Sequence, residues 1–319
     1  MNLLDEREYY KPFVYPWAFE KYKRQQQMHW LPDEVPLQDD IKDYNMKLSA
    51  DERLLIDNIF RFFTQADVDV CCGYAKHYLP TFKQPEIRMM LVSFAAMEAV
   101  HQEAYSLLLE TLGKSDDMYQ EFFDIQAMSD KHDYLTDFSM ETKHDIAKTM
   151  AVYSGFTEGV QLFSSFAILL NYPRHNLMKG MGQIVTWSIR DESLHVEGLS
   201  ELFRTFMREN PELWTDKLKY EIYCAAERTV ELEDNFIDVC FNKVTVPDLT
   251  AAEVKEYIRY IADRRLLGLG MKAIFKSTEN PLPWIDMQVN AVEHTNFFEN
   301  RATEYAKAST QGNWQDVFK

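Results

Sequence analysis

The sequence predicts an all-α protein built from long helices packed into a bundle. Strand-like alternation of apolar and polar residues is almost absent along the 319 residues. Fifteen methionines and only ten glycines favour long helices over a turn-rich β protein. A hydrophobic content of 46% is enough for a large core, and the length fits one large domain or two ordinary ones.

Capping and stop signals delimit the expected helices. Prolines interrupt roughly the first 45 residues, so no long helix is expected there. Ser49–Glu52 is a capping box that opens a helix to about Leu79, and Thr250–Glu253 opens another to about Leu267. A helix begins near Pro85 and ends at Gly113. Further helices are expected over about 119–128, 145–171, 176–209 and 211–240, with a polar connector between the first two of these.

Charge and targeting signals exclude several classes of protein. The net charge of −17 argues against direct binding to nucleic acid or to an anionic membrane surface. The N-terminus has no signal-peptide layout, and the longest apolar stretch, LFSSFAILL, is too short to cross a bilayer. The cysteines form no CxxC motif and are expected to be small buried thiols; they are Cys71, Cys72, Cys224 and Cys240. We therefore expect a cytoplasmic protein that contacts no membrane.

One pattern of polar residues occurs twice. Glu98 and His101 stand three residues apart within MEAVHQEAY, and Glu192 and His195 repeat the spacing within RDESLH. On a helix each pair points the same way. Each pair is preceded, one long helix earlier, by a carboxylate on an otherwise apolar stripe; these carboxylates are Asp67 and Glu158. The duplication makes coincidence a poor explanation.

Two similar patterns are weaker candidates. Glu141 and His144 also have the Glu-x-x-His spacing, but they lie in a polar run where solvated side chains explain them. Asp69 faces Gln65, Ala66 and Lys76 rather than the apolar stripe that carries Asp67. We therefore leave both out of the predicted site.

Six such side chains on four helices are the ligand set of dinuclear carboxylate proteins. Four carboxylates in one core would carry an uncompensated charge of −4, which two divalent cations cancel. Hard oxygen ligands with one imidazole per metal suit iron or manganese, and the lack of thiolates disfavours structural zinc. The sequence does not choose between two iron and two manganese ions.

Tyr105 lies one helical turn beyond His101, so the motif places a phenol beside a predicted metal ligand. A tyrosine on an apolar face can be simple core packing. Beside an oxygen-activating dimetal site it is a possible one-electron donor. Phe94, Leu162, Phe166 and Val185 are apolar candidates to shield it.

With these motifs in the right order, the chain resembles the radical-generating small subunit of class I ribonucleotide reductase from about Trp30 to the tail. The resemblance implies a ferritin-like helical bundle with the dimetal site between four core helices. It implies that all six predicted ligands bind the metals and that Tyr105 matches the tyrosine that holds the radical. The metal cluster itself is the alternative store.

The resemblance also implies a transfer path to a separate catalytic subunit. Trp30 in HWLPDEV, Asp191 and the tail residue Tyr305 match that path. Trp30 could instead be ordinary core, and Asp191 could orient a ligand histidine. Residues 1–298 are expected to form the bundle domain and residues 299–319 a flexible tail that docks on the partner; its anchor candidates are Trp314, Val317 and Phe318.

A missing motif supports this division of labour. The chain has neither GxGxxG nor a P-loop, so the substrate nucleotides are expected to bind to the large catalytic subunit. By resemblance the chain is an oxidoreductase subunit for deoxyribonucleotide synthesis and forms a homodimer. Two rival functions share the bundle: a dimetal monooxygenase or oxidase, and a ferritin-like metal storage protein.

Overall fold

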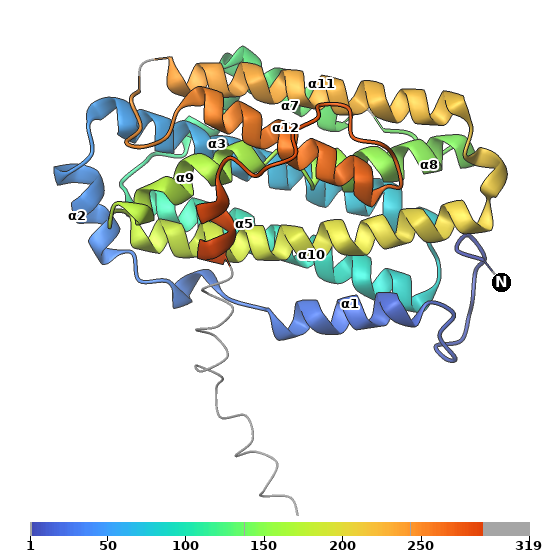
Figure 1. Cartoon of the computed structure of the whole chain (residues 1–319). Helices are drawn as coiled ribbons and strands as arrows, with labels where there is room; N and C mark the ends of the chain where they lie inside the picture. Colours follow the sequence, from blue (N-terminus) through green and yellow to red (C-terminus); the bar gives the residue numbers. More distant parts are fainter. Residues whose placement is uncertain (1, 137, 243, 290–319) are drawn as a thin grey trace, which may run out of the picture. The chain divides into compact units, whose positions relative to one another are not determined.

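In the computed structural model of the protein, which describes residues 2–136, 138–242 and 244–289, four helical rods lie side by side and form the core. The rods are α3 (Ala50–Gly73), α5 (Pro85–Thr111), the pair α8 (Lys143–Val152) and α9 (Phe163–Arg174), and α10 (Lys179–Glu209). Helix α5 packs against α3 and α10, and α10 packs against α8 and α9. Figure 1 shows these rods running along one another.

Further helices cover the two open sides of the four rods. Helix α1 (Pro16–Gln27) lies along α5 and α10, while α11 (Asp216–Phe241) and α12 (Ala251–Gly268) cover α8 and α9 (Figure 1). The remaining elements are α2 (Gln38–Met46), α4 (Leu79–Thr81), α6 (Asp117–Gln120), α7 (Gln126–Thr136), and the short turns η1 (Pro32–Glu34), η2 (Tyr74–Tyr78), η3 (Glu121–Asp124), η4 (Tyr153–Thr157) and η5 (Pro211–Leu213).

The all-α prediction is confirmed, because the described residues contain helices and no strand beyond one isolated bridge between Val246 and Leu249. Residues up to Leu282 form one compact unit, and residues 283–289 of the second unit are helical. The predicted boundary at residue 298 and the tail beyond it lie outside the described residues. No helix in the described ranges is both long and apolar enough to span a bilayer.

Both predicted capping boxes are present. The Ser49 hydroxyl accepts from the Glu52 amide at 3.2 Å while the Glu52 carboxylate accepts from the Ser49 amide at 2.9 Å. Thr250 and Glu253 form the same pair of bonds at the start of α12. The helix predicted to end at Gly113 stops there with a glycine at φ 77°, a left-handed conformation that favours glycine.

Two predicted boundaries were wrong. The polar connector expected after residue 128 is largely helical, because α7 continues to Thr136 and buries Lys131 against Glu233. The unbroken helix expected over 145–171 is interrupted by η4, a wide π turn, and by an irregular stretch up to Leu162. The Glu158 amide bonds back five residues to the Tyr153 carbonyl at 3.0 Å, which marks the wider turn.

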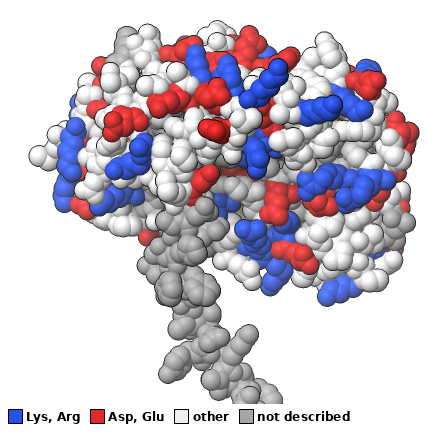
Figure 2. Space-filling model, in the orientation of Figure 1, with Lys and Arg blue, Asp and Glu red and all other residues white. Residues whose placement is uncertain are grey.

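The surface carries both signs of charge. On the face drawn in Figure 2, lysine and arginine side chains are interspersed with aspartate and glutamate. The cysteine prediction was only partly right: Cys240 is buried, Cys71 and Cys224 are half-buried, and Cys72 is exposed. All four are free thiols. The two adjacent cysteines of α3 point about 100° apart on the helix.

Candidate metal centre

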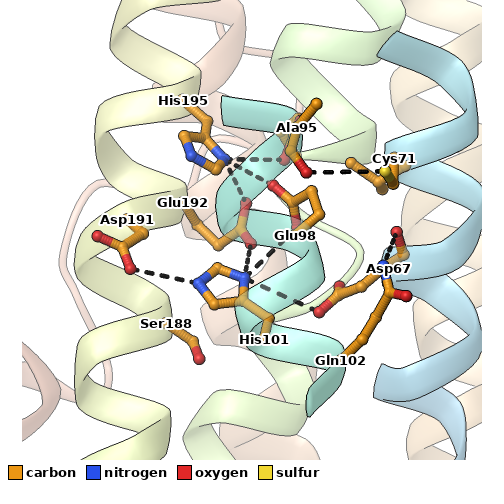
Figure 3. A network of polar contacts seen from close by, with 12 residues as sticks. Asp67, Cys71, Ala95, Glu98, His101, Gln102, Ser188, Asp191, Glu192 and His195 are labelled. Carbon is orange, nitrogen blue, oxygen red and sulfur yellow. Dashed lines mark hydrogen bonds and ion pairs between the residues drawn. The ribbon is translucent and has the colours of Figure 1, made fainter. Parts of the chain in front are cut away.

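The four rods bring the six predicted ligands to one point in the core. Asp67 comes from α3, Glu98 and His101 from α5, Glu158 from the irregular stretch after η4, and Glu192 and His195 from α10. All six side chains are fully buried. The Gln102 amide donates to the Asp67 carbonyl at 3.0 Å, which fixes the register of α3 against α5. Figure 3 shows five of the six side chains facing the space between their helices.

The cluster divides into two halves, one around each imidazole. His101 Nδ1 lies 3.4 Å from Glu98 Oε2, 3.4 Å from Glu192 Oε1 and 3.8 Å from Asp67 Oδ2. His195 Nδ1 lies 2.9 Å from Glu98 Oε1, 3.6 Å from Glu192 Oε2 and 3.9 Å from Glu158 Oε2. Glu98 and Glu192 therefore offer one oxygen to each half (Figure 3), while Asp67 and Glu158 each belong to one half.

The donor set fits two cations. The two halves form groups whose donor atoms all lie within 4.8 Å of one another, and the groups share Glu98. Both oxygens of Asp67, Glu98 and Glu192 are buried without a hydrogen-bond partner among the described residues, and so is Nδ1 of both histidines. Buried carboxylate oxygens and imidazole nitrogens without a partner are costly in free energy unless a cation binds them. Four carboxylates and two neutral imidazoles balance two divalent ions in charge.

The carboxylates and imidazoles perturb one another strongly. Burial, together with the charge of Glu98, raises the pKa of Asp67 well above its usual range. Burial and the neighbouring Glu192 raise the pKa of Glu158 to about 7. The surrounding carboxylates outweigh burial and raise the pKa of both imidazoles. Without cations the cluster therefore retains protons, which metal ions would displace.

One of the two imidazoles is connected to a buried tryptophan. His101 Nε2 lies 3.3 Å from Asp191 Oδ2, and the Trp30 indole donates to the same oxygen at 2.8 Å. Gln25 donates to the other Asp191 oxygen at 3.3 Å. Burial opposes ionisation of Asp191, but the bond to His101 prevails and lowers its pKa. Trp30 is therefore a core residue and Asp191 a hydrogen-bond partner of His101, while the role of both in a transfer path stays a prediction.

Tyr105 is fully buried beside the His101 half of the cluster, with ring centroids 6.2 Å apart. Its immediate aromatic neighbours are Phe63 at 5.0 Å and Phe60 at 5.6 Å, both on α3. The prediction that Phe94 shields Tyr105 was wrong, because Phe94 lies 4.4 Å from the ring of His195 in the other half.

Phe166 packs against Phe63, with ring centroids 5.1 Å apart, and Phe63 in turn packs against Tyr105. The Tyr105 hydroxyl has no hydrogen bond of good geometry in the described part of the chain. Leu162 and Val185, the other two shielding candidates, are buried. The ring of Tyr105 is thus enclosed by apolar side chains, while its hydroxyl lies beside that of Ser188.

Comparison with known proteins decides the family. The family model for the ribonucleotide reductase small chain matches residues 7–281. The chain is 46% identical to the probable ribonucleoside-diphosphate reductase small subunit 376L of Invertebrate iridescent virus 6, over 100% of this chain and 99% of the relative. It is 33% identical to the ribonucleoside-diphosphate reductase subunit beta of Chlamydia pneumoniae, over 93% of this chain and 89% of that protein.

The chain belongs to the ribonucleotide reductase small-chain family. It is accordingly the small subunit of an oxidoreductase, a ribonucleoside-diphosphate reductase.

Solved structures of ribonucleotide reductase small subunits share the fold. The Clostridium botulinum R2 subunit superposes with a TM-score of 0.80 at 22% identity, covering 86% of this chain and 88% of that one. The dimanganese(II) NrdF protein of Streptococcus sanguinis gives 0.76 at 23% identity, over 88% and 99%. The predicted ferritin-like bundle is thereby confirmed.

The remaining candidates lie away from this cluster or outside the described residues. Asp69 pairs with His132 at 2.5 Å, and His144 forms a half-buried pair with Glu221 at 2.7 Å. Tyr305 and the anchor candidates Trp314, Val317 and Phe318 lie beyond residue 289, outside the described part. Trp187, which belongs to none of the predicted motifs, also lies next to this site, with its ring 5.1 Å from that of Trp30.

Proposed function

We propose that the six converging side chains hold two metal ions and that the subunit generates a radical with them. The observation that carries the proposal is the set of buried, unpaired donor atoms on the carboxylates and imidazoles of the two halves. Glu98 and Glu192, which reach both halves, are suited to bind both ions, and Asp67 and Glu158 to bind one each. When bound, the ions supply the electrons that reduce an oxygen species and the oxidising equivalent that follows.

The chain itself orients these ligands and excludes water. Asp191 fixes the ring of His101 by accepting a hydrogen bond from its outer nitrogen, Nε2, which leaves Nδ1 free to bind a metal. The Phe60 and Phe63 rings enclose Tyr105, so an oxidised Tyr105 is protected from solvent reductants. We infer that Tyr105 stores the radical, with the metal cluster as the alternative store.

The metals are two iron ions in this proposal, with two manganese ions as the alternative. Both suit oxygen-rich ligands with one imidazole each. A relative of the same fold is named as a dimanganese(II) protein. Metal analysis of the protein purified from its own host, together with electron paramagnetic resonance, decides between them. The proposal is contradicted if the purified protein contains less than one metal ion per chain and still binds none after it is incubated with Fe(II) or Mn(II).

The oxidising equivalent is proposed to reach a large catalytic subunit through Trp30, Asp191 and Tyr305. The hydrogen-bonded series His101–Asp191–Trp30 supports the first part of this path. The tail, residues 299–319, is proposed to dock on the large subunit, which binds the nucleotides. Deleting residues 300–319 should abolish reductase turnover while metal content and the radical signal persist. A monooxygenase or a ferritin-like storage protein would keep its activity after that deletion.

A second copy of the chain is proposed to cover the outer face of α3 and α5, as in a homodimer. Small and apolar side chains are exposed there and on the adjoining η2, and they are Val68, Cys72, Ala75, Val92, Ala96 and Ala99. The contacts from Cys71 to Ala95 and from Gln102 to Asp67 place these two rows beside one another. Val92→Lys should shift the mass measured by sedimentation towards that of the monomer, whereas Met46→Lys on α2 should not.

The cytoplasmic location of the protein also stays a prediction.

A further inference from the structure

A second tyrosine contacts the cluster from the side opposite Tyr105. Tyr74, in η2, is fully buried, and its hydroxyl donates to Glu158 Oε1 at 2.5 Å. Its ring lies 6.5 Å from that of His195. His101 and His195 occupy opposite ends of the cluster in Figure 3, so Tyr74 and Tyr105 flank different halves.

The hydrogen-bond partner distinguishes Tyr74 from the other buried tyrosines near the cluster. A phenol that loses an electron becomes strongly acidic, so an acceptor at hydrogen-bond distance favours its oxidation. Tyr74 has a carboxylate, and a bond of this length to a carboxylate is a charge-assisted one. Tyr153 donates to the Val70 carbonyl at 2.5 Å, which is a weak base. The Tyr78 hydroxyl has no partner in the described ranges, while the Tyr105 hydroxyl lies beside the Ser188 hydroxyl and close to the carboxylate of Asp67.

The surroundings of Tyr74 keep that proton in place. Its ring packs against Phe94 at 6.4 Å, Tyr153 at 5.6 Å and Tyr78 at 5.8 Å, all of them buried. Water therefore does not compete for the hydroxyl, and Glu158 is the only acceptor that the described residues offer it. The same wall excludes reductants that would destroy a radical formed there.

We propose that Tyr74 is a second one-electron donor to the metal centre, acting from the Glu158 and His195 half. This inference rests on the proposed function, because the oxidised dimetal centre is the oxidant. One electron leaves the phenol for that centre, the O–H bond of Tyr74 breaks, and its proton passes to Glu158 Oε1. The products are a neutral tyrosyl radical at Tyr74 and a centre reduced by one electron.

The two tyrosines have different tasks in this scheme. Tyr105 is the store, on the same half as His101, Asp191 and Trp30. Tyr74 lies on the other half, where the outer nitrogen of His195 has no hydrogen-bond partner among the described residues. It therefore accepts the oxidising equivalent when Tyr105 is absent, and holds that equivalent away from the path that begins at Trp30.

The test removes Tyr105 and looks for a radical at Tyr74. The Tyr105→Phe variant is loaded anaerobically with Fe(II), mixed with dioxygen and frozen within the first turnover for electron paramagnetic resonance. We expect a tyrosyl signal that narrows when the protein contains ring-deuterated tyrosine. The signal should be lost in the variant that also carries Tyr74→Phe and retained in the one that also carries Tyr78→Phe. Metal content of each variant is measured in parallel.

A second measurement avoids any loss of metal or fold through Tyr74→Phe. In the Tyr105→Phe background, 3-fluorotyrosine is incorporated at position 74, which preserves the phenol and its bond to Glu158. A radical at this site acquires a fluorine hyperfine splitting, whereas 3-fluorotyrosine at position 78 leaves the signal unsplit. An unsplit signal with the label at 74, or no tyrosyl signal in Tyr105→Phe, overturns the proposal.

The outcomes also separate this inference from the proposed function. If the unmodified chain binds two ions and yields a Tyr105 signal while Tyr105→Phe yields none, only the role of Tyr74 fails. If the unmodified chain binds no metal or yields neither a tyrosyl nor a cluster signal, the proposed function fails first.

Discussion

Replacing Lys131 should be among the most destabilising single changes in this protein. Its ammonium group is fully buried, pairs with the equally buried Glu233 and donates to the Gln161 carbonyl at 2.8 Å. It also lies over the Phe62 ring at 3.9 Å and the Phe236 ring at 4.4 Å. Burial lowers the pKa of Lys131 and raises that of Glu233, so the loss of hydration disfavours the charged form of both partners.

The expected cost follows from the charge that Lys131→Met leaves behind. Removing one partner of a buried pair costs about 3–5 kcal/mol because the other charge stays buried and uncompensated. At about 2–4 °C per kcal/mol, the thermal midpoint should fall by roughly 6–20 °C. Adding Glu233→Gln removes the stranded charge and still allows a bond with Ser164. The double variant should therefore regain at least ~2 kcal/mol.

Urea unfolding at fixed metal concentration measures both variants. Lys42→Met is the matched control, since Lys42 pairs with Asp39 but is 70% exposed, and such surface pairs contribute only about 0–1 kcal/mol. The reasoning is refuted if Lys131→Met costs no more than this control, or if the double variant is no more stable than the single one.

Three further predictions concern the centre and its neighbours. Asp191→Asn should lower turnover with the large subunit about 10–100-fold in a steady-state assay at saturating metal, where metal content and the tyrosyl signal should persist, because the bonds that join His101 to Trp30 through Asp191 are weakened. Gly198→Ala should cost about 1–3 kcal/mol in thermal unfolding, because its Cβ would lie 2.8 Å from the Phe94 ring. Metal affinity, measured by competition with a chelator, should fall as the pH drops below 7, because burial and Glu192 raise the pKa of Glu158 to about 7 and its proton then competes with the metal. An affinity that is constant from pH 8 to 6 would contradict this.

The helical fold could be predicted because its signals are local. Ser49 and Glu52, and likewise Thr250 and Glu253, form their capping boxes from residues three positions apart, and the structure has both. The convergence of the two Glu-x-x-His pairs was also predictable, since helical periodicity places each pair on one face. Their role as metal ligands remains our proposal.

What sequence reasoning missed depends on contacts between distant segments. The segment that forms α7 was predicted to be a polar connector because Lys131 and its neighbours are polar. Lys131 is buried only because it pairs with Glu233, about a hundred residues later on α11, and the local sequence does not show that pair. The interruption of the helix around Glu158 could not be predicted from a proline, because residues 145–171 contain none. It is accommodated by Gly159, where a Cβ would lie 2.3 Å from the Gly155 carbonyl oxygen, and by Arg265, whose Nε donates to the Gly159 carbonyl at 2.9 Å.

These two distant cations explain how an irregular segment can position a ligand. Where the helix is interrupted, carbonyl groups lose their intrahelical partners and would be costly if left unpaired in the core. Arg265 from α12 donates to the carbonyl of Gly159, and Lys131 from α7 donates to that of Gln161. Both carbonyls lie within three residues of Glu158.

The outer helices α7 and α12 therefore do more than cover the four rods. They stabilise the interrupted backbone that carries Glu158, and through it the contact between Glu158 and Tyr74. The His101 half needs no such support, because its ligands come from the regular helices α3, α5 and α10. The two halves of the centre, alike in their Glu-x-x-His motifs, thus differ both in the backbone that carries their ligands and in their partners: Asp191 and Trp30 on one side, and Tyr74 on the other.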